Sequence, residues 1–342
     1  MATADGGASA APPLDCLVIG AGISGLLAAQ ALRVAGYRVL VVDKGRGVGG
    51  RMACRRVGTA HIDHGAQFFT CRSAEFGALV ASWVAGGTAV EWYRGSAAAA
   101  GEGHARYRGR PAMTAGPKRL GADHQVLTEA RVEALALVGG VWAARIEGGR
   151  RITAQAVVAS APVPQTLALL DAGAAPLPAA LRAELDLVEY APCIAVLARL
   201  SRPSGMPPPG AVALEDGALR WIADNQLKGV SDVPALTLHA APSFSRAHLA
   251  ATDADITARL LAAAAPHATL AVDEVQVHRW RYAEPTRGPS ARCLSTPLPA
   301  PIVFCGDAFG GPRVEGAALS GLAAGRRAAE LLAERCPPLA PR

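Results

Sequence analysis

Hydrophobic and polar residues follow each other along this chain in patterns that predict a mixed α/β protein. Residues 14–20 (LDCLVIG) form a short apolar run ending in glycine, which predicts a buried strand. Small and aliphatic residues recur at the helical period through residues 22–35, which predicts a helix ended by Gly36. Residues 38–43 (RVLVVD) are apolar on both faces, as in a strand of a parallel sheet. Together these segments predict a βαβ unit.

The rest of the chain continues this mixture. We expect further helices at residues 76–85, 165–170, 177–187, 254–265 and 314–335. We expect strands at residues 126–136, 141–146, 153–159, 194–200, 211–214, 219–223, 235–240, 275–282 and 302–305. The first βαβ unit and the last strand–helix pair look like parts of one domain. We therefore predict an α/β fold with a discontinuous Rossmann-like domain (residues 14–72, 118–165 and 290–335). A smaller inserted domain with an antiparallel sheet would interrupt it at residues 73–117 and 166–289. Residues 1–13 would form a disordered tail that precedes both domains.

Composition limits the functional classes. The net charge of +6 fits either a solvated surface or a protein that handles anionic ligands, and no Lys/Arg run is long enough for a nucleic-acid patch. The seven cysteines are scattered without zinc spacing, which indicates reduced thiols and no metal site. No apolar run reaches the length of a membrane span, and the N-terminal residues do not resemble a signal peptide. We therefore expect a cytoplasmic protein without nucleic-acid or membrane partners.

The first chemical motif is GAGISG at residues 20–25, between the predicted strand and helix. Its G-x-G-x-x-G spacing gives Gly20 for a tight turn, Gly22 for close approach to a pyrophosphate and Gly25 for helix–strand packing. The helix N-terminus would face the phosphates. Asp43 ends the next strand, where a carboxylate accepts hydrogen bonds from ribose hydroxyls. The pattern predicts dinucleotide binding.

A second glycine motif, RGVGGR at residues 46–51, follows directly. It is either a flexible basic loop or a second phosphate-contacting segment, in which glycines allow close approach and Arg46 and Arg51 donate charge-assisted hydrogen bonds. It resembles the R-x-G-G-R segment of the amine-oxidase-like FAD superfamily. This resemblance favours FAD over NAD.

Two further stretches resemble flavin-contacting segments of the same superfamily. In residues 62–70 (IDHGAQFFT), Gly65 and Ala66 would let the backbone lie against the flavin ring, unless this is an ordinary edge strand. In residues 304–309 (FCGDAF), a buried strand ends in Gly306 and Asp307, and Asp307 would bind the ribityl or phosphate region. The following helix would point its N-terminus at the flavin N1/O2 edge and stabilise reduced flavin.

These residues together identify a family resemblance over nearly the whole chain. The matching stretches are VIGAGISGLLAAQAL, DKGRGVGGRM, IDHGAQFFT, GRPAMTAGPKRL, VVASAPVPQTLALL, RWIADNQLKG, HRWRYAEP and FCGDAFGGPRVEGAALSG. They are similar to bacterial renalase-like proteins, a branch of the amine-oxidase-like FAD superfamily. The resemblance implies an FAD-binding domain, a substrate domain that roofs the flavin, and non-covalent FAD. It implies cofactor contacts from Gly20, Gly22, Ile23, Ser24, Gly25, Asp43, Lys44, Arg46, Gly50, Arg51, Met52, Gly65, Ala66, Gln67, Val132, Gly306, Asp307, Arg313, Val314 and Ala317.

The resemblance also implies a reaction. It suggests an oxidase that takes a hydride from an isomeric dihydronicotinamide dinucleotide to flavin N5, with O2 as electron acceptor and hydrogen peroxide as product. No catalytic side chain is required, because the flavin carries the redox chemistry. The candidate substrate-pocket residues are Gln67, Phe69, Trp221, Asn225, Trp280, Tyr282 and Arg313. After Asn225 the chain departs from the usual family pattern. Two alternatives stay open: an amine oxidase or desaturase of a specialised metabolite, and a non-catalytic FAD-binding sensor or scaffold.

Overall fold

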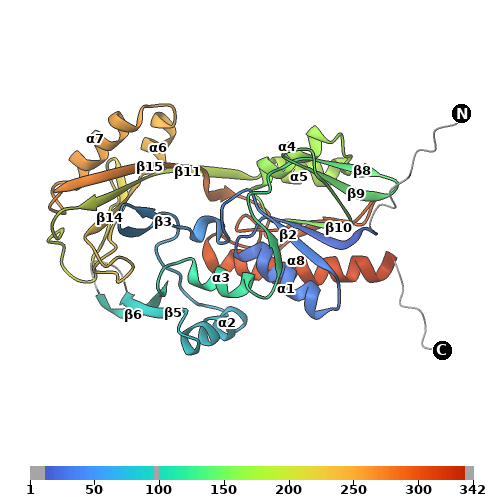
Figure 1. The fold of residues 1–342 in the computed structure, drawn as a ribbon, viewed down its shortest axis with the longest axis horizontal. Coiled ribbons are helices and arrows are strands. Elements are labelled where there is room, and N and C mark those ends of the chain that lie inside the picture. The colour runs from blue at the N-terminus through green and yellow to red at the C-terminus, as the bar shows by residue number, and fades with distance from the viewer. Residues whose placement is uncertain (1–11, 96–99, 336–342) are drawn as a thin grey trace, which may run out of the picture.

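The larger unit of the fold is built on an eight-stranded sheet (Figure 1). The computed structural model describes residues 12–95 and 100–335. The main strand order is β16-β17-β10-β1-β2-β7, and β9 joins β8 to β10. The strands are β1 (Leu14–Ile19), β2 (Val39–Val42), β7 (Gln125–Leu127), β8 (Val132–Val138), β9 (Val141–Ile146), β10 (Arg151–Ala159), β16 (Leu294–Thr296) and β17 (Ile302–Phe304). Because β1, β2, β7, β10 and β17 run parallel, their carboxyl ends meet at one edge, where ligands bind in such sheets.

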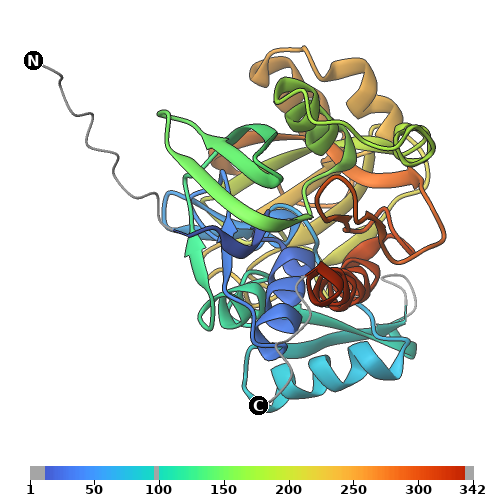
Figure 2. The same ribbon diagram turned by 90° about the vertical axis from the view of Figure 1, so that its right-hand side faces the viewer.

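Helices cover both faces of this sheet. One face carries α1 (Ile23–Val34) and α8 (Arg313–Arg335), which lie side by side in Figure 2. Their contact is close because α8 presents glycines: a Cβ on Gly321 would lie 2.2 Å from the Ser24 carbonyl oxygen. The other face packs against α4 (Val163–Ala172) and α5 (Ala179–Asp186), together with side chains of the sheet's own β8–β9 hairpin. The two ends of the chain thus build one core.

The smaller unit is a five-stranded antiparallel sheet in the order β12-β13-β14-β11-β15. Its strands are β11 (Glu189–Leu200), β12 (Ala211–Ala213), β13 (Leu219–Asp224), β14 (Ala235–Ala240) and β15 (Val272–Arg287). Its outer face packs against α6 (Pro242–His248) and α7 (Asp253–Ala264). Its inner face packs against the hairpin of β3 (Cys54–Val57) and β4 (Ala60–Asp63), which belongs to the N-terminal part of the chain. That hairpin therefore joins the two units.

A second hairpin lies below this joint in Figure 1, formed by β5 (Ala89–Gly95) and β6 (Ala100–Gly109). Beside it lies α2 (Ala74–Ala85), which is capped by the Ser73 side chain and contacts both β5 and α8. The short helices η1 (Gly50–Met52) and α3 (Ala115–Gly121) complete the part of the chain that the structure describes. No helix within it is long and apolar enough to cross a membrane, and its six cysteines form no disulfide.

The α/β fold with an inserted antiparallel sheet is confirmed, with differences in detail. The single strand predicted at residues 126–136 is two strands, because Glu129 has a φ of +53° and turns the chain between them. As a result β7 pairs with β2, whereas β8 pairs with β9. Helices α3 and α6 were not predicted, because seven residues are too few to show a helical period. Residues 1–11 of the predicted tail lie outside the described residues.

Candidate flavin site at the junction of the two units

The first glycine motif forms an open helix terminus at the carboxyl edge of the large sheet. Gly20 ends β1 with a φ of +107°, and a Cβ on Gly25 would lie 2.0 Å from the Gly20 carbonyl oxygen, so the turn and the packing both require glycine. Gly22 is the N-cap of α1 and supplies no side-chain cap. A Cβ on Gly22 would meet nothing within 4 Å. The N-terminal N–H groups of α1 are thus open to an anionic ligand.

The second glycine motif folds back onto the first. Gly50 has a φ of +53°, and a Cβ there would lie 3.3 Å from the Gly22 Cα. The Gly49 N–H donates to the Ala21 carbonyl, and a Cβ on Gly47 would also meet open space. The carboxylate of Asp43 accepts hydrogen bonds from the N–H groups of Ala21 (2.7 Å) and Gly45 (2.6 Å). Asp43 therefore holds both motifs in place at the position where a ribose-binding acid was expected.

Arg51 and Asp307, predicted as separate cofactor contacts, bind each other. The guanidinium donates two hydrogen bonds of 2.6 Å to the two carboxylate oxygens. It also donates to the carbonyls of Tyr282 and Ala283 on β15. Burial raises the pKa of Asp307, and the neighbouring Arg51 opposes this shift. The pair ties the glycine loop to the strand and to the C-terminal flavin segment, and it neutralises the buried carboxylate.

The C-terminal segment presents a second open helix terminus. A Cβ on Gly311, whose φ is +122°, would meet nothing within 4 Å. Arg313 begins α8 with a φ of +78°, a conformation that is uncommon outside glycine and concentrates at functional sites. Its side chain is exposed, whereas Val314 and Ala317 are buried beneath it. The positive end of the α8 dipole thus faces the same edge of the sheet as that of α1.

These features fit the predicted dinucleotide. Three glycines of the two N-terminal motifs and the C-terminal segment, Gly22, Gly47 and Gly311, border open space where a Cβ would meet no atom. Two helix N-termini supply N–H donors beside them. Ile23, Ser24 and Met52 lie in the buried walls of this region. The remaining predicted contacts lie at its margin: Lys44, whose ammonium group donates to Gln165; exposed Arg46; and Val132, at the start of β8.

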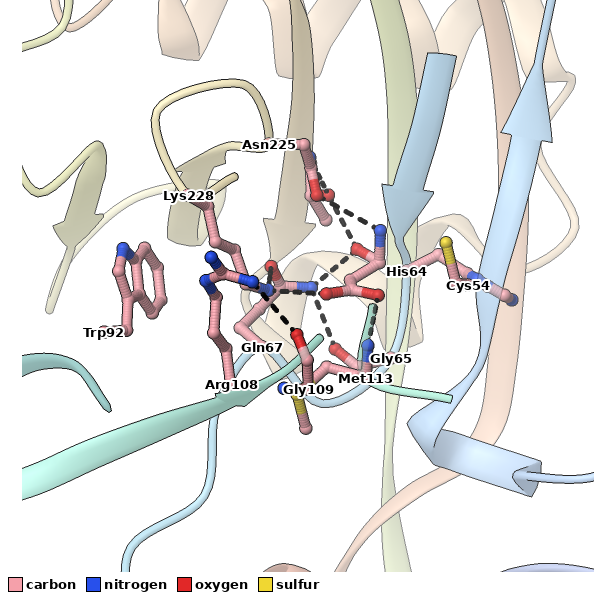
Figure 3. A network of polar contacts seen from close by, with 12 residues as sticks. Cys54, His64, Gly65, Gln67, Trp92, Arg108, Gly109, Met113, Asn225 and Lys228 are labelled. Atoms are coloured by element: carbon pink, nitrogen blue, oxygen red, sulfur yellow. Dashed lines mark hydrogen bonds and ion pairs between the residues drawn. The ribbon is translucent and has the colours of Figure 1, made fainter. Parts of the chain in front are cut away.

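A buried polar network joins the two units beside the Gly65–Ala66 segment (Figure 3). At its centre, Lys228 Nζ lies 2.9 Å from Asp63 Oδ2, and both side chains are completely buried. Lys228 also donates to Gln67 Oε1 at 3.2 Å and lies 5.1 Å from the centre of the Trp92 ring. Burial lowers the pKa of Lys228, and Asp63 opposes this shift. Asp63 Oδ1 accepts from the Met113 N–H.

Gln67 and Asn225, predicted to face substrate, are used inside this network. The Gln67 amide donates to the carbonyls of Asp63 (2.7 Å) and Gly65 (3.1 Å). Asn225 accepts from the Asp63 N–H and donates to Thr237, whose hydroxyl donates to the Asp63 carbonyl. These contacts fix the backbone of the segment expected to face the flavin. Sequence reasoning did not single out Lys228, because nothing in the local pattern distinguishes a buried lysine from an exposed one.

The inner face of the small sheet forms a roof of aromatic and imidazole rings. Trp221 pairs with His239 across β13 and β14, and both His239 and His278 lie opposite Ala195 of β11, so the three side chains form one row. His64 lies against this row: its ring stacks on Trp280, and its carbonyl accepts from His239 Nε2 and Trp280 Nε1. The predicted aromatic residues Trp221 and Trp280 therefore lie on the same inner face of the small sheet, on β13 and β15.

The histidines at this roof are neutral at ordinary pH. Burial lowers the pKa of His64 to about 3, and the nearby His278 adds to the shift. Burial also lowers the pKa of His239 to about 4. The pKa of His278 is lowered to about 4 by burial and by Arg55, whose guanidinium lies 3.4 Å from His278 Nδ1. A neutral ring nitrogen accepts the Arg55 hydrogen bond, so the row carries no charge of its own.

Of two adjacent phenylalanines, the structure places the unpredicted one at the roof. Phe69 is 3% exposed and packs in the core against Phe76, Trp83 and Tyr107. Its backbone pairs with Tyr107, which turns the Phe69 side chain into the large unit. Phe68 instead contacts Trp221, with 5.5 Å between ring centres. The predicted Tyr282 lies edge-on to Tyr190, beside the Arg51–Asp307 pair.

Comparison with known proteins supports this geometry. The profile described as NAD(P)-binding Rossmann-like domain matches residues 18–83, and that described as flavin containing amine oxidoreductase matches residues 89–329. A double mutant of putrescine oxidase is similar in fold, with a TM-score of 0.69 and 18% identity over 94% of this chain and 100% of that chain. Wild-type putrescine oxidase with bound putrescine gives a TM-score of 0.68 and 18% identity, covering 94% of this chain and 99% of that chain. A protein described as a protoporphyrinogen oxidase, from Exiguobacterium sp. 255-15, gives 0.70 and 12%, covering 95% and 99% of the two chains.

The family profile covers well over half of the chain, and the cradle built from both ends of the chain fits a flavin dinucleotide. The chain therefore belongs to the flavin-containing amine oxidoreductase family and is an FAD-dependent oxidoreductase.

Proposed function

We propose that this protein is an oxidase of isomeric dihydronicotinamide dinucleotides. The substrate would give a hydride to N5 of bound FAD and leave as NAD(P)+, while O2 takes up the two electrons and, with one further proton, becomes hydrogen peroxide. Arg51, Asp43 and the two helix N-termini would hold the cofactor, and the rings of the small sheet would lie above the substrate.

The distribution of charge at the junction is the observation that carries this proposal. Each buried carboxylate there has partners: Asp63 binds Lys228, Asp307 binds Arg51, and Asp224 accepts from Ser204 and two backbone N–H groups. Arg55 and Arg106 form no ion pair with a carboxylate of residues 12–95 or 103–335. A protonated amine would find no free carboxylate here, whereas a phosphate-bearing, uncharged dihydropyridine suits the site.

The neutral histidines support the same reading. Loss of a hydride leaves the nicotinamide ring positively charged, and a protonated imidazole beside it would oppose this step. The low pKa values of His64, His239 and His278 keep the roof uncharged across the neutral range. The combined stretches HRWRYAEP and GGPRVEGAALSG, similar to renalase-like proteins, point to the same substrate class. The departure after Asn225 is expected to alter substrate contacts only indirectly, since Asn225 itself is buried in the joint.

Anaerobic reduction of the flavin tests the proposal. FAD-loaded protein is mixed without oxygen with 2-, 4- and 6-dihydronicotinamide isomers or with amines such as putrescine, and the flavin absorbance band is followed. Bleaching by 2- or 6-dihydronicotinamides, and stoichiometric peroxide after oxygen is readmitted, is the expected result. Bleaching by amines alone would overturn it.

An amine oxidase is the second candidate, and the family description and the fold of putrescine oxidase favour it. The same experiment separates the two, because an amine oxidase bleaches with amines and leaves the dihydronicotinamides unchanged. Lack of bleaching by either class would count against both and favour a role for FAD without turnover.

A further inference from the structure

Aromatic rings and one guanidinium form a continuous line where the β5–β6 hairpin meets the small sheet. Phe68 lies 5.5 Å from Trp221 between ring centres. The Arg106 guanidinium lies 4.3 Å from the centre of the Phe68 ring and 5.4 Å from that of Tyr93. Tyr93 and Arg106 are cross-strand neighbours in the hairpin. Residues from three separate parts of the chain thus meet at one place beside the roof.

Two polar atoms in this line are buried without a partner. Neither Trp221 Nε1 nor Tyr93 Oη has a hydrogen-bond partner among the described residues, and Tyr93 is only 8% exposed. Three other indoles are satisfied: Trp92, Trp142 and Trp280 each donate to a backbone carbonyl. Because burying an unpaired donor is unfavourable, two such donors, one at each end of this line, indicate a ligand that supplies the acceptors.

Arg106 adds charge to these two donors. Its Nε donates to the Gly95 carbonyl, which fixes the guanidinium plane over the rings. Arg106 forms no ion pair with a carboxylate of residues 12–95 or 103–335, whereas Arg94 on the same hairpin pairs with Glu91. Guanidinium groups stacked on aromatic rings keep their outer N–H groups available, and they bind phosphate oxygens well. The three groups are donors of different geometry, and all of them require oxygen acceptors.

We propose that Arg106, Tyr93 and Trp221 form a subsite for a phosphate group of the substrate. This subsite rests on the proposed function, because an isomeric dihydronicotinamide nucleotide carries its phosphates away from the reacting ring. The ring lies against the neutral roof, and the phosphate takes hydrogen bonds from the guanidinium, the indole and the phenol. The hairpin thereby selects nucleotides over ribosides, and it contributes to substrate affinity rather than to the hydride step.

Calorimetric titration of the FAD-loaded protein tests the subsite. The probes are inorganic pyrophosphate, nicotinamide mononucleotide and nicotinamide riboside, which lacks the phosphate. Arg106→Gln is expected to weaken mononucleotide and pyrophosphate binding by roughly tenfold or more and to leave riboside binding unchanged. Tyr93→Phe, which removes only the hydroxyl, should weaken the same two probes several-fold. Arg94→Gln is the matched control, because it removes one charge from the same hairpin and should change none of these affinities.

The steady-state kinetics give a second readout. With dihydronicotinamide mononucleotide, Arg106→Gln should raise KM and leave kcat unchanged, while the parameters for the riboside stay the same. Equal affinity of wild-type and Arg106→Gln protein for pyrophosphate and mononucleotide would overturn the subsite, as would an equal loss for riboside. The two proposals fail separately. If no dihydronicotinamide bleaches the flavin but pyrophosphate binding depends on Arg106, the proposed substrate is wrong and the phosphate subsite stands.

Discussion

Replacing Lys228 by methionine should destabilise the protein more than any substitution at its exposed ion pairs. The change keeps an unbranched side chain, one atom shorter, but removes the ammonium group that lies 2.9 Å from Asp63 Oδ2 and 3.2 Å from Gln67 Oε1. Asp63 would then be a buried carboxylate with only the Met113 N–H as a donor to its side chain. A buried charge without its partner strongly disfavours the folded state.

The expected magnitude follows from the burial of both groups. At an effective dielectric constant of about 20, two unit charges at this separation attract each other by roughly 6 kcal/mol. Part of this attraction offsets the cost of desolvating the two groups, so we expect a loss of about 3–5 kcal/mol on removing one partner. Changing both partners should cost less than the sum of the two single changes, because Lys228→Met with Asp63→Asn leaves no unpaired charge.

Urea unfolding of the FAD-loaded protein measures these differences. The set comprises Lys228→Met, Asp63→Asn and the double variant, with Arg220→Met as control. Arg220 pairs with Glu284 at the surface, where a pair contributes only about 0–1 kcal/mol. The reasoning is refuted if the two single changes add up in the double variant, or if Lys228→Met costs no more than the control.

Three further outcomes are expected. Gly22→Val should abolish FAD retention, measured as flavin absorbance per protein, without lowering the apoprotein Tm, because the new side chain would enter open space. Gly25→Val should instead prevent folding, since its Cβ would lie 2.0 Å from a carbonyl oxygen. Normal FAD retention by Gly22→Val would contradict the assignment of the cradle. The free energy of unfolding should fall as pH drops from about 6.5 to about 4, by up to about 1.4 kcal/mol per pH unit for each of His64, His239 and His278. The folded-state pKa values of these histidines are depressed, so the unfolded chain binds more protons in this range. Replacing His64 by glutamine should flatten this slope in a pH series of denaturant melts, and an unchanged slope would rule His64 out as a contributor. Arg313→Gly should raise the free energy of unfolding by about 1 kcal/mol, because glycine relieves the strain of the φ of +78°. Both Arg313→Gly and Arg313→Ala should lower turnover, but Arg313→Ala should bring no gain in stability. Equal stability of the two variants would argue against strain.

The cofactor cradle is the part of the molecule that the sequence predicts well. Glycine positions depend directly on backbone geometry, so the motif spacing alone predicts the turn at Gly20 and the close packing at Gly25 that the structure has. Asp43 could be placed because it ends a strand at a fixed distance from them. Local patterns suffice here because the first βαβ unit is continuous in the chain.

The junction could not be predicted in the same way, because its contacts join distant segments. Lys228 meets Asp63 across 165 positions, and Arg51 meets Asp307 across 256. Alternation along a strand predicted that Gln67 and Phe69 share one face. The isolated pairing of the Phe69 backbone with Tyr107 instead turns Phe69 into the core, and Phe68 faces the roof. Tyr93 and Arg106 belong to a hairpin whose contact with Phe68 no local period predicts.

The contact of α1 with α8 has a consequence for how the protein is made. The N-terminal glycine cradle emerges early in synthesis, but Gly321 and Gly325, which receive α1, follow the entire small sheet in the chain. Until they arrive, the side of α1 that packs against α8 stays exposed on the nascent chain, although its contacts with β1, β2 and α3 can already form. The small sheet is contiguous from β11 to β15 and can pair as it emerges. Folding should therefore be completed only when α8 packs against α1. FAD binding is then expected as a late, post-translational step, and α1 is the surface most in need of a chaperone.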